Sequence, residues 1–130
     1  MTEEEKQLVF KDLCARLPYG VVVERTYIPE NNGYTSKLSA NTLDIVLDDN
    51  WSVKPYLRPM SSMTEEEKNE VAKLGVCYDG AFHNDVYDVG TSIEEAFLAI
   101  SWLIERHFDI NYLINKGLAL EAKEGMYKNE

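Results

Sequence analysis

The chain of 130 residues carries 23 acidic and 13 basic side chains, which gives it a net charge of −10. Such a charge repels nucleic-acid phosphates, so direct binding to DNA or RNA is not expected. With 45% hydrophobic and 28% charged residues, the composition is that of a globular protein and excludes disordered and fibrous chains. The length suits a single domain, residues 1–130, with one core.

Cysteine content and apolar runs indicate the compartment. Cys14 and Cys77 are too few for a disulfide framework and stand among apolar residues, so we expect buried, reduced thiols. The N-terminus lacks the basic and apolar parts of a secretory signal, and the longest apolar run, residues 96–100, is far too short to span a bilayer. The sequence therefore predicts a cytoplasmic protein that does not enter a membrane.

The hexapeptide Met-Thr-Glu-Glu-Glu-Lys occurs twice, at residues 1–6 and 63–68. In each copy the Thr can cap a helix while the Glu three residues later reaches back to the Thr N–H, the arrangement known as a capping box. We predict helices over about residues 3–17 and 64–74, the second ended by Gly75. The apolar side of the first helix comprises Val9, Phe10, Leu13, Cys14 and Leu17.

Between these helices the pattern favours short strands. Residues 20–28 are rich in β-branched and aromatic side chains and lead into turn residues 29–33. A second strand is expected either around 37–39 or at 43–47, where apolar residues alternate, and a third at 51–56. Since the connections are short, we predict that the sheet is antiparallel.

The last third of the chain is predicted to be mainly helical. A long helix over 92–107 begins with its own box, and its apolar arc comprises Ile93, Ala96, Phe97, Ile100, Leu103 and Ile104. Asp109 can cap a shorter helix over 110–116, followed by extended residues 118–120 and a charged, flexible tail over about 122–130. The fold class is thus α+β: a small antiparallel sheet with about four helices packed on one side.

Catalytic signatures are absent from the sequence. It contains no Gly-rich phosphate loop, no Gly-x-Ser-x-Gly elbow and no His-Glu-x-x-His motif, so we expect neither a catalytic residue nor a cofactor. In the segment 77–88, Asp79, His83 and Asp85 could contribute to a metal site, but no second histidine or Cys-x-x-Cys pair lies nearby. His107 is expected to interact with the last carbonyls of the long helix.

Two places in the sequence are candidates for contact with another protein. The first is the loop before the second capping box, where prolines alternate with cationic, aromatic and Met side chains: Lys54, Tyr56, Arg58, Met60 and Met63. The second is Leu98 and Trp102, which project from the long helix away from its main apolar arc. The alternative for the loop is that it is a well-packed connector. The alternative for Leu98 and Trp102 is that another part of the same chain covers them.

Three blocks of the sequence, residues 11–20, 53–64 and 116–122, resemble a family of short proteins of unknown function from gut Bacteroides genomes and their phages. The resemblance covers about a third of the chain and implies a bacterial or prophage origin. It implies no catalytic residue, cofactor or ligand. The tail departs from the family, because residues 121–127 hold no proline where its members carry one.

These observations lead to three functional hypotheses. We favour a non-enzymatic interaction module, an accessory factor of a phage or mobile element that binds another protein. The first alternative is an acidic inhibitor that mimics nucleic acid and occupies the basic groove of a host protein. The second is a small enzyme or metal protein that uses the segment 77–88. A homo-oligomer is left open.

Overall fold

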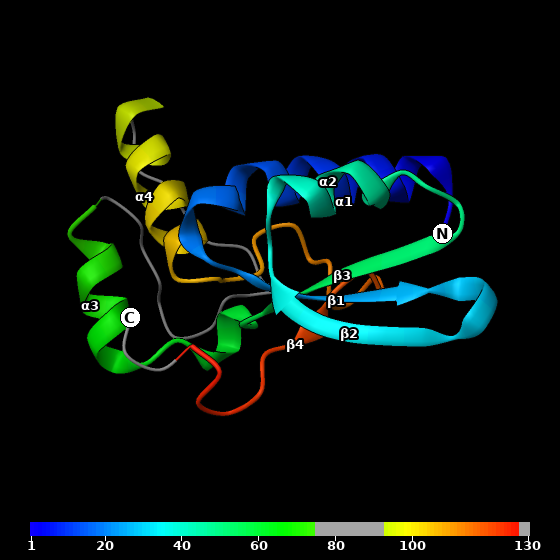
Figure 1. Cartoon of the computed structure of the whole chain (residues 1–130). Coiled ribbons are helices and arrows are strands. Elements are labelled where there is room, and N and C mark those ends of the chain that lie inside the picture. The colour runs from blue at the N-terminus through cyan, green and yellow to red at the C-terminus, as the bar shows by residue number, and fades with distance from the viewer. Residues whose placement is uncertain (75–92, 128–130) are drawn as a thin grey trace.

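The computed structural model describes residues 1–74 and 93–127 and confirms the α+β class. Helices and strands follow one another along the chain (Figure 1) in the order α1 (Glu3–Arg16), β1 (Val22–Tyr27), β2 (Asn32–Lys37), α2 (Ala40–Val46), β3 (Trp51–Leu57), α3 (Glu65–Ala72), α4 (Ile93–Glu105) and β4 (Leu120–Glu121). Single turns of 3-10 helix cover Leu17–Tyr19, Ile28–Glu30 and Met60–Ser62. None of the described helices is both long and apolar enough to cross a membrane.

The four strands form one sheet in the order β2-β1-β3-β4. β1 pairs antiparallel with both β2 and β3, and the short turn between β1 and β2 predicts the first of these pairings. β4 pairs parallel with β3, Tyr56 lying opposite Leu120, so the sheet is mixed. A parallel neighbour needs a long connection, and here residues 58–119 lie between the two strands.

Helices α1 and α2 cover one face of the sheet (Figure 1). Their apolar side chains meet those of β1 and β3 in a core that includes Val9, Leu13, Val23, Val46, Val53 and Leu57. This core also encloses two charged residues of α1, Asp12 and Arg16, which no apolar pattern predicts. Their carboxylate and guanidinium form a buried ion pair, with 2.7 Å between Arg16 Nε and Asp12 Oδ2.

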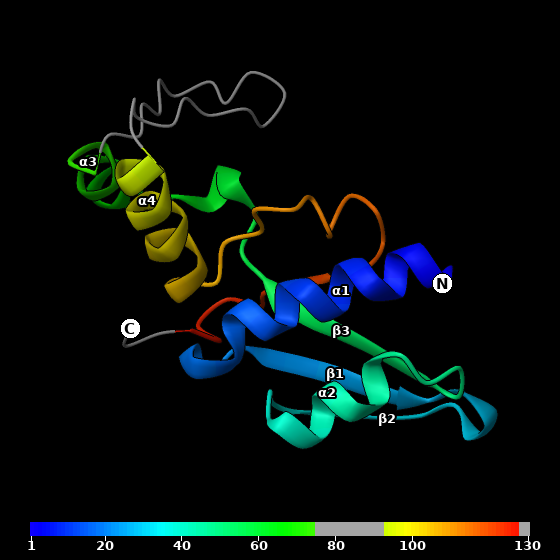
Figure 2. The ribbon, with the colours of Figure 1, turned by 90° about the horizontal axis from the view of Figure 1, so that it is seen from above.

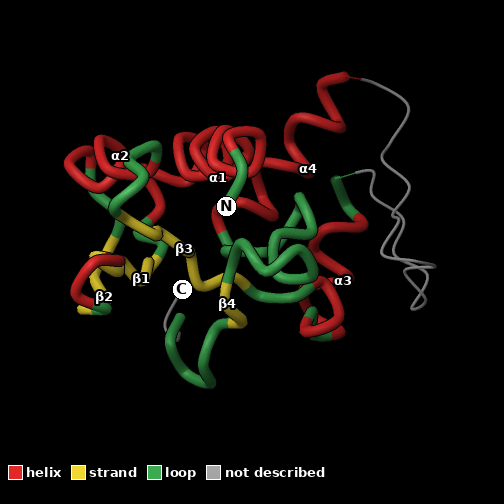
Figure 3. Tube along the Cα trace, turned by 90° about the vertical axis from the view of Figure 1, so that its right-hand side faces the viewer, coloured by secondary structure: helices red, strands yellow, loops and turns green. Residues whose placement is uncertain are grey.

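Helices α3 and α4 lie together to one side of the sheet (Figures 2 and 3). They belong to a second apolar cluster that comprises Met60, Met63, Val71, Ala99, Trp102, Leu103 and Phe108. Residues 107–109 join this cluster to the sheet. The N–H of Arg58 donates to the carbonyl of His107, the N–H of Asp109 donates to the carbonyl of Arg58, and Arg16 Nη2 donates to the carbonyl of Phe108 at 2.7 Å.

Both predicted capping boxes are present. The hydroxyl of Thr2 accepts from the Glu5 N–H, and that of Thr64 accepts from the Glu67 N–H, both at 3.1 Å. Each Glu carboxylate in turn accepts from the N–H of its Thr. The first helix ends at Arg16, just before Pro18, as predicted. Gly75 and Ser92, the expected cap of the second helix and start of the long one, lie outside the described residues.

The second capping box makes a testable contribution to stability. We expect Thr64→Ala to lower the free energy of unfolding by about 1 kcal/mol, because it removes the acceptor for a helix N–H. Thr64→Ser keeps that hydroxyl and should lie close to the wild type. Urea denaturation of the three proteins measures the effect, and equal losses for Ala and Ser would show that the hydroxyl contributes nothing.

One predicted strand is a helix. Residues 43–47, one of the two places offered for the second strand, lie mostly in α2, and the strand itself is Asn32–Lys37. The alternation of Leu43, Ile45 and Leu47 is misleading, because the buried residues of α2 are Thr42 and Val46, four apart on one side of a helix. Leu47 lies beyond the helix and is exposed.

The predicted helix over 110–116 is also wrong. Asp109 does bind backbone ahead of it, since its carboxylate accepts from the N–H groups of Leu113 and Ile114 at 2.9 and 3.0 Å. Tyr112, however, has a φ of 56°, a left-handed conformation that interrupts a right-handed helix. The segment therefore forms successive turns that end at Gly117, whose φ is 74°.

Two predicted buried positions are exposed. Cys14 lies on the outer side of α1, so its predicted burial is wrong, while Cys77 is outside the described residues. Phe97, placed by the pattern on the apolar arc of α4, is 68% exposed. The buried side of α4 instead includes Ala99, Trp102 and Leu103, because the cluster with Phe108 lies on that side.

The segment expected as a charged tail folds back onto the sheet as far as the structure describes it. The hydroxyl of Tyr127 donates to the carbonyl of Tyr56 at 2.6 Å and accepts from the N–H of Val22 at 2.8 Å. Its ring stacks on that of His107, with 3.8 Å between ring centroids. One aromatic residue thus anchors residues 122–127, which their charge alone did not suggest.

Candidate contact surface

Most of the loop predicted as a contact surface is packed inside the protein. Met60 and Met63 are buried in the cluster with Trp102 and Phe108. Tyr56 is buried as well, with Lys123 Nζ 5.6 Å from the centre of its ring. These side chains are not available to a partner, and the loop is the well-packed connector given as its alternative.

Arg58 is committed to internal contacts. Its guanidinium binds both carboxylate oxygens of Glu67, each at 2.7 Å, and lies 4.1 Å from the centre of the Phe108 ring. Burial alone would raise the pKa of Glu67, but hydrogen bonds from Arg58 and Thr64 outweigh it and lower that pKa. Arg58 therefore ties β3 to the start of α3.

The two candidate residues on α4 have different surroundings. Trp102 is buried, stacked on Phe108 at 6.1 Å between ring centroids, with Arg106 over its ring at 4.1 Å. Trp102 is therefore covered by other residues of the same chain, which was the alternative given for it. Leu98 remains 46% exposed beside Phe97, so these two side chains form a small apolar patch.

The described part of the chain contains no cluster of metal ligands, and its histidine is buried. Across residues 1–74 and 93–127, no three His, Cys, Asp or Glu side chains gather as metal ligands would. Asp79, His83 and Asp85 lie outside those ranges. The His107 ring is buried rather than placed at an exposed helix end, and burial together with the charges of Arg16 and Arg58 lowers its pKa to about 4.

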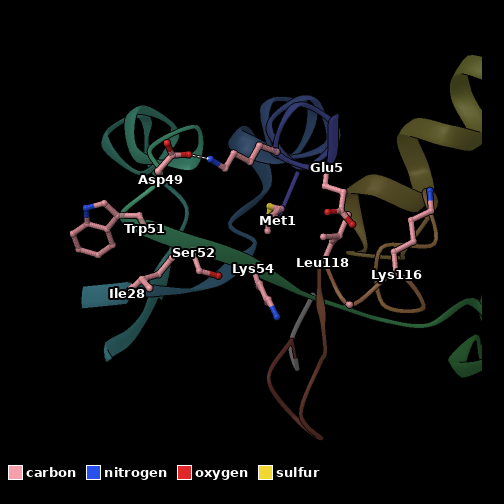
Figure 4. A pocket seen from close by; sticks show the side chains of 11 residues that line it. Met1, Glu5, Ile28, Asp49, Trp51, Ser52, Lys54, Lys116 and Leu118 are labelled. Carbon is pink, nitrogen blue, oxygen red and sulfur yellow. Dashed lines mark hydrogen bonds and ion pairs between the residues drawn. The ribbon is translucent and has the colours of Figure 1, made fainter. Parts of the chain in front are cut away.

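An open pocket of about 410 Å³ lies between the start of α1, the beginning of β3 and the turn at 116–118 (Figure 4). Met1, Glu5 and Lys6 come from the α1 end, Trp51, Ser52 and Lys54 from β3, and Ile28 and Asp49 from the neighbouring turns. Lys116, Gly117 and Leu118 form the opposite wall. Of the residues predicted to contact a partner, Lys54 alone lines this pocket.

Aromatic side chains continue the surface from the pocket across the sheet. Trp51 of β3 contacts Tyr27 of β1, with 5.2 Å between ring centroids, and Tyr34 of β2 at 6.3 Å. Arg25 lies over the Tyr34 ring at 5.0 Å. We call the residues Met1, Ile28, Tyr34 and Trp51 the hairpin-end surface. Met1, Ile28 and Tyr34 are 50%, 52% and 43% exposed, so apolar and aromatic groups here face solvent.

The charges around the pocket are unevenly matched. Lys6 forms an ion pair with Asp49, which raises the pKa of Lys6 and lowers that of Asp49. The Glu5 carboxylate accepts from the Thr2 N–H within the capping box, which lowers its pKa. Lys54 and Lys116 have no ion-pair partner among the described residues. Lys54 and Lys116 thus share the pocket with the Glu5 carboxylate, and its three lysines and two carboxylates give the lining side chains a formal charge of +1 on a strongly acidic protein.

A larger pocket of about 730 Å³ lies between residues 58–64 and 121–127. Two of its polar side chains are engaged within the chain: Arg58 binds Glu67, and the Tyr127 hydroxyl bridges Tyr56 and Val22. Glu121, Lys123 and Glu124 also line it and make no ion pair among the described residues, so its unpaired charges are of both signs, whereas Lys54 and Lys116 are both cations.

None of the four residues of the hairpin-end surface was among those predicted to contact a partner. A signal was present, because Ile28 and Trp51 stand next to turn residues, where polar side chains are usual. The sequence around Tyr34 and Lys116 contains no such signal, because the position of Tyr34 depends on the strand register and that of Lys116 on the turn at 113–117. No protein-family model, curated protein or solved structure matches the chain.

Proposed function

We propose that the protein is a non-enzymatic interaction module that binds another protein through the hairpin-end surface. The observation that carries this proposal is that exposed Met1 and Ile28 line one pocket together with half-buried Trp51, whose ring contacts exposed Tyr34. Tyr, Trp and Met are enriched at protein interfaces, where large rings supply contact area at a small entropic cost. The bacterial or prophage origin that the resemblance implies is compatible with an accessory factor of this kind.

The arrangement of the surface supports binding over catalysis. The Trp51 ring is held by Tyr27 and Tyr34, so little side-chain freedom is lost when a partner packs on it. Charged side chains, Lys54 and Lys116 among them, border the apolar residues, and interfaces commonly have such a polar rim. No nucleophile paired with a base is found among the pocket's lining residues.

A pull-down with two matched variants tests the proposal. Tagged full-length protein is exposed to a lysate of the source cells, and bound proteins are identified by mass spectrometry. We expect Ile28→Asp to reduce capture of the partner at least about tenfold, because it places a charge in an apolar contact. Both Ile28 and the control residue Leu98 are about half exposed, so neither substitution should unfold the protein.

The control variant, Leu98→Asp, alters the exposed apolar patch on α4 and should capture the partner like the wild type. Loss with Leu98→Asp and retention with Ile28→Asp would move the interface to α4 and contradict the proposal. Recovery of no partner by the wild-type protein at low or high salt would contradict binding altogether. Circular dichroism of the three proteins verifies that each is folded.

The acidic mimic draws little support from the structure. Its most acidic segments, Glu3–Glu5 and Glu65–Glu67, begin α1 and α3, and these helix starts lie at opposite ends of the molecule (Figures 1 and 2). A mimic of nucleic acid needs carboxylates spaced along one surface. A metal site in the segment 77–88 lies outside the described residues, so it adds nothing to the choice.

A further inference from the structure

We propose that the pocket beside Trp51 binds an acidic segment of the partner, with one apolar side chain seated against Ile28 and Met1 and carboxylates near Lys54 and Lys116. This inference rests on the proposed function and specifies the chemistry of the partner. The pocket's volume of about 410 Å³ suits one or two side chains of a peptide.

The charge distribution is the first argument. The chain has a net charge of −10, yet the pocket is lined by three lysines and two carboxylates. Lys6 and Asp49 form an ion pair with one another, and the Glu5 carboxylate accepts a hydrogen bond from the Thr2 N–H in the helix cap. Lys54 and Lys116 come from different walls and extend in different directions (Figure 4), so an acidic segment needs carboxylates at two separate positions to meet both. Such complementarity sets specificity and accelerates association.

The apolar lining is the second argument. Ile28 and Met1 are about half exposed, and Leu118 forms part of the opposite wall. A purely ionic ligand would leave Ile28 and Met1 in water, whereas an apolar side chain between acidic residues would cover them. A segment with alternating carboxylates and one aliphatic residue satisfies both parts of the pocket.

Synthetic peptides test this inference without knowledge of the partner. The probe is a nine-residue peptide with Asp and Glu on both sides of a central Leu, and its two counterparts carry Asn and Gln, or Lys, in place of the acids. Binding is followed by the amide shifts of Ser52, Lys54 and Gly117 in ¹H–¹⁵N spectra. We expect the acidic peptide alone to shift these signals, and added salt to weaken its binding by screening the charges.

Two double variants with the same loss of charge locate the site. Lys54→Gln with Lys116→Gln should weaken the acidic peptide about tenfold. Lys11→Gln with Lys73→Gln removes two exposed lysines that do not line the pocket and should change affinity less than twofold. Equal effects of the two pairs would overturn the assignment, because binding would then depend on net charge alone.

Further outcomes separate this inference from the function on which it rests. Sodium acetate at the same carboxylate concentration should cause no comparable shifts, and equal shifts would make the occupant a small anion. Binding of the neutral or basic peptide as tightly as the acidic one would refute the acidic preference. If Ile28→Asp abolishes capture of the natural partner while no acidic peptide binds, the proposed function stands and this inference fails.

Discussion

Replacing Asp12 by Ala is expected to destabilise the protein by about 3–5 kcal/mol, the cost of leaving the charge of a buried ion pair without its partner. The Asp12 carboxylate accepts from Arg16 Nε at 2.7 Å, from Arg16 Nη2 at 3.2 Å and from Asn111 Nδ2 at 2.8 Å. Arg16 is fully buried, and its Nη1 already has no hydrogen-bond partner in the described part of the chain. Guanidinium denaturation at pH 7 measures the loss.

An exposed ion pair supplies the matched control. Glu65 pairs with Lys68 at 3.1 Å on α3, and its side chain is 85% exposed. We expect Glu65→Gln to change the free energy of unfolding by less than about 0.5 kcal/mol, because water replaces the lost contact. A double variant, Asp12→Leu with Arg16→Met, should recover part of the loss since no buried charge remains. A loss for Asp12→Ala as small as that for Glu65→Gln would refute this account.

Acid should destabilise the protein through His107 well before most carboxylates are protonated. Its pKa is lowered to about 4, first by burial and then by the charges of Arg16 and Arg58, whereas the unfolded chain binds a proton near pH 6.5. Stability is therefore fully present above pH 6.5 and falls as the pH drops toward 4, where the loss reaches about 3 kcal/mol. Denaturation series at pH 7, 5.5 and 4 measure this slope.

His107→Asn is the control variant. His107 has a φ of 68°, which Asn tolerates better than most residues, and an amide does not titrate. The variant should be less stable at pH 7, because the stack on Tyr127 is lost, but its stability should change little between pH 6.5 and about 4.5. Equal slopes for both proteins would assign the acid sensitivity to other groups, such as Asp49 and Glu67, whose pKa values are also lowered.

Local signals allowed a good part of the fold to be predicted. Each capping box depends on residues within four positions of one another, and both formed. Strands β1 and β3 followed from β-branched and aromatic residues bounded by turns. Helix α2 could not be predicted in this way, because its apolar residues satisfy a strand pattern and a helix pattern at once, and only packing against α1 and β3 decides between them.

Long-range contacts account for what could not be predicted. The parallel pairing of β4 and the docking of Tyr127 depend on partners far away in the chain. The same limit applied to the candidate site. Met60, Met63 and Trp102 suggested an interface by residue type, yet residue type cannot tell a buried cluster from an exposed one. The surface beside Trp51 depends on the strand register, which brings Tyr27 and Tyr34 next to Trp51.

The contacts of Tyr127 have a consequence for the order of folding. Val22 and Tyr127 are 105 positions apart, and Tyr56 and Tyr127 are 71 apart, so these bonds close very long loops. On the ribosome, β1, β2 and β3 can pair while the rest of the chain is still being made, whereas β4 and Tyr127 can join only afterwards. We expect completion of the sheet to be the slow step of folding, since such distant contacts form late.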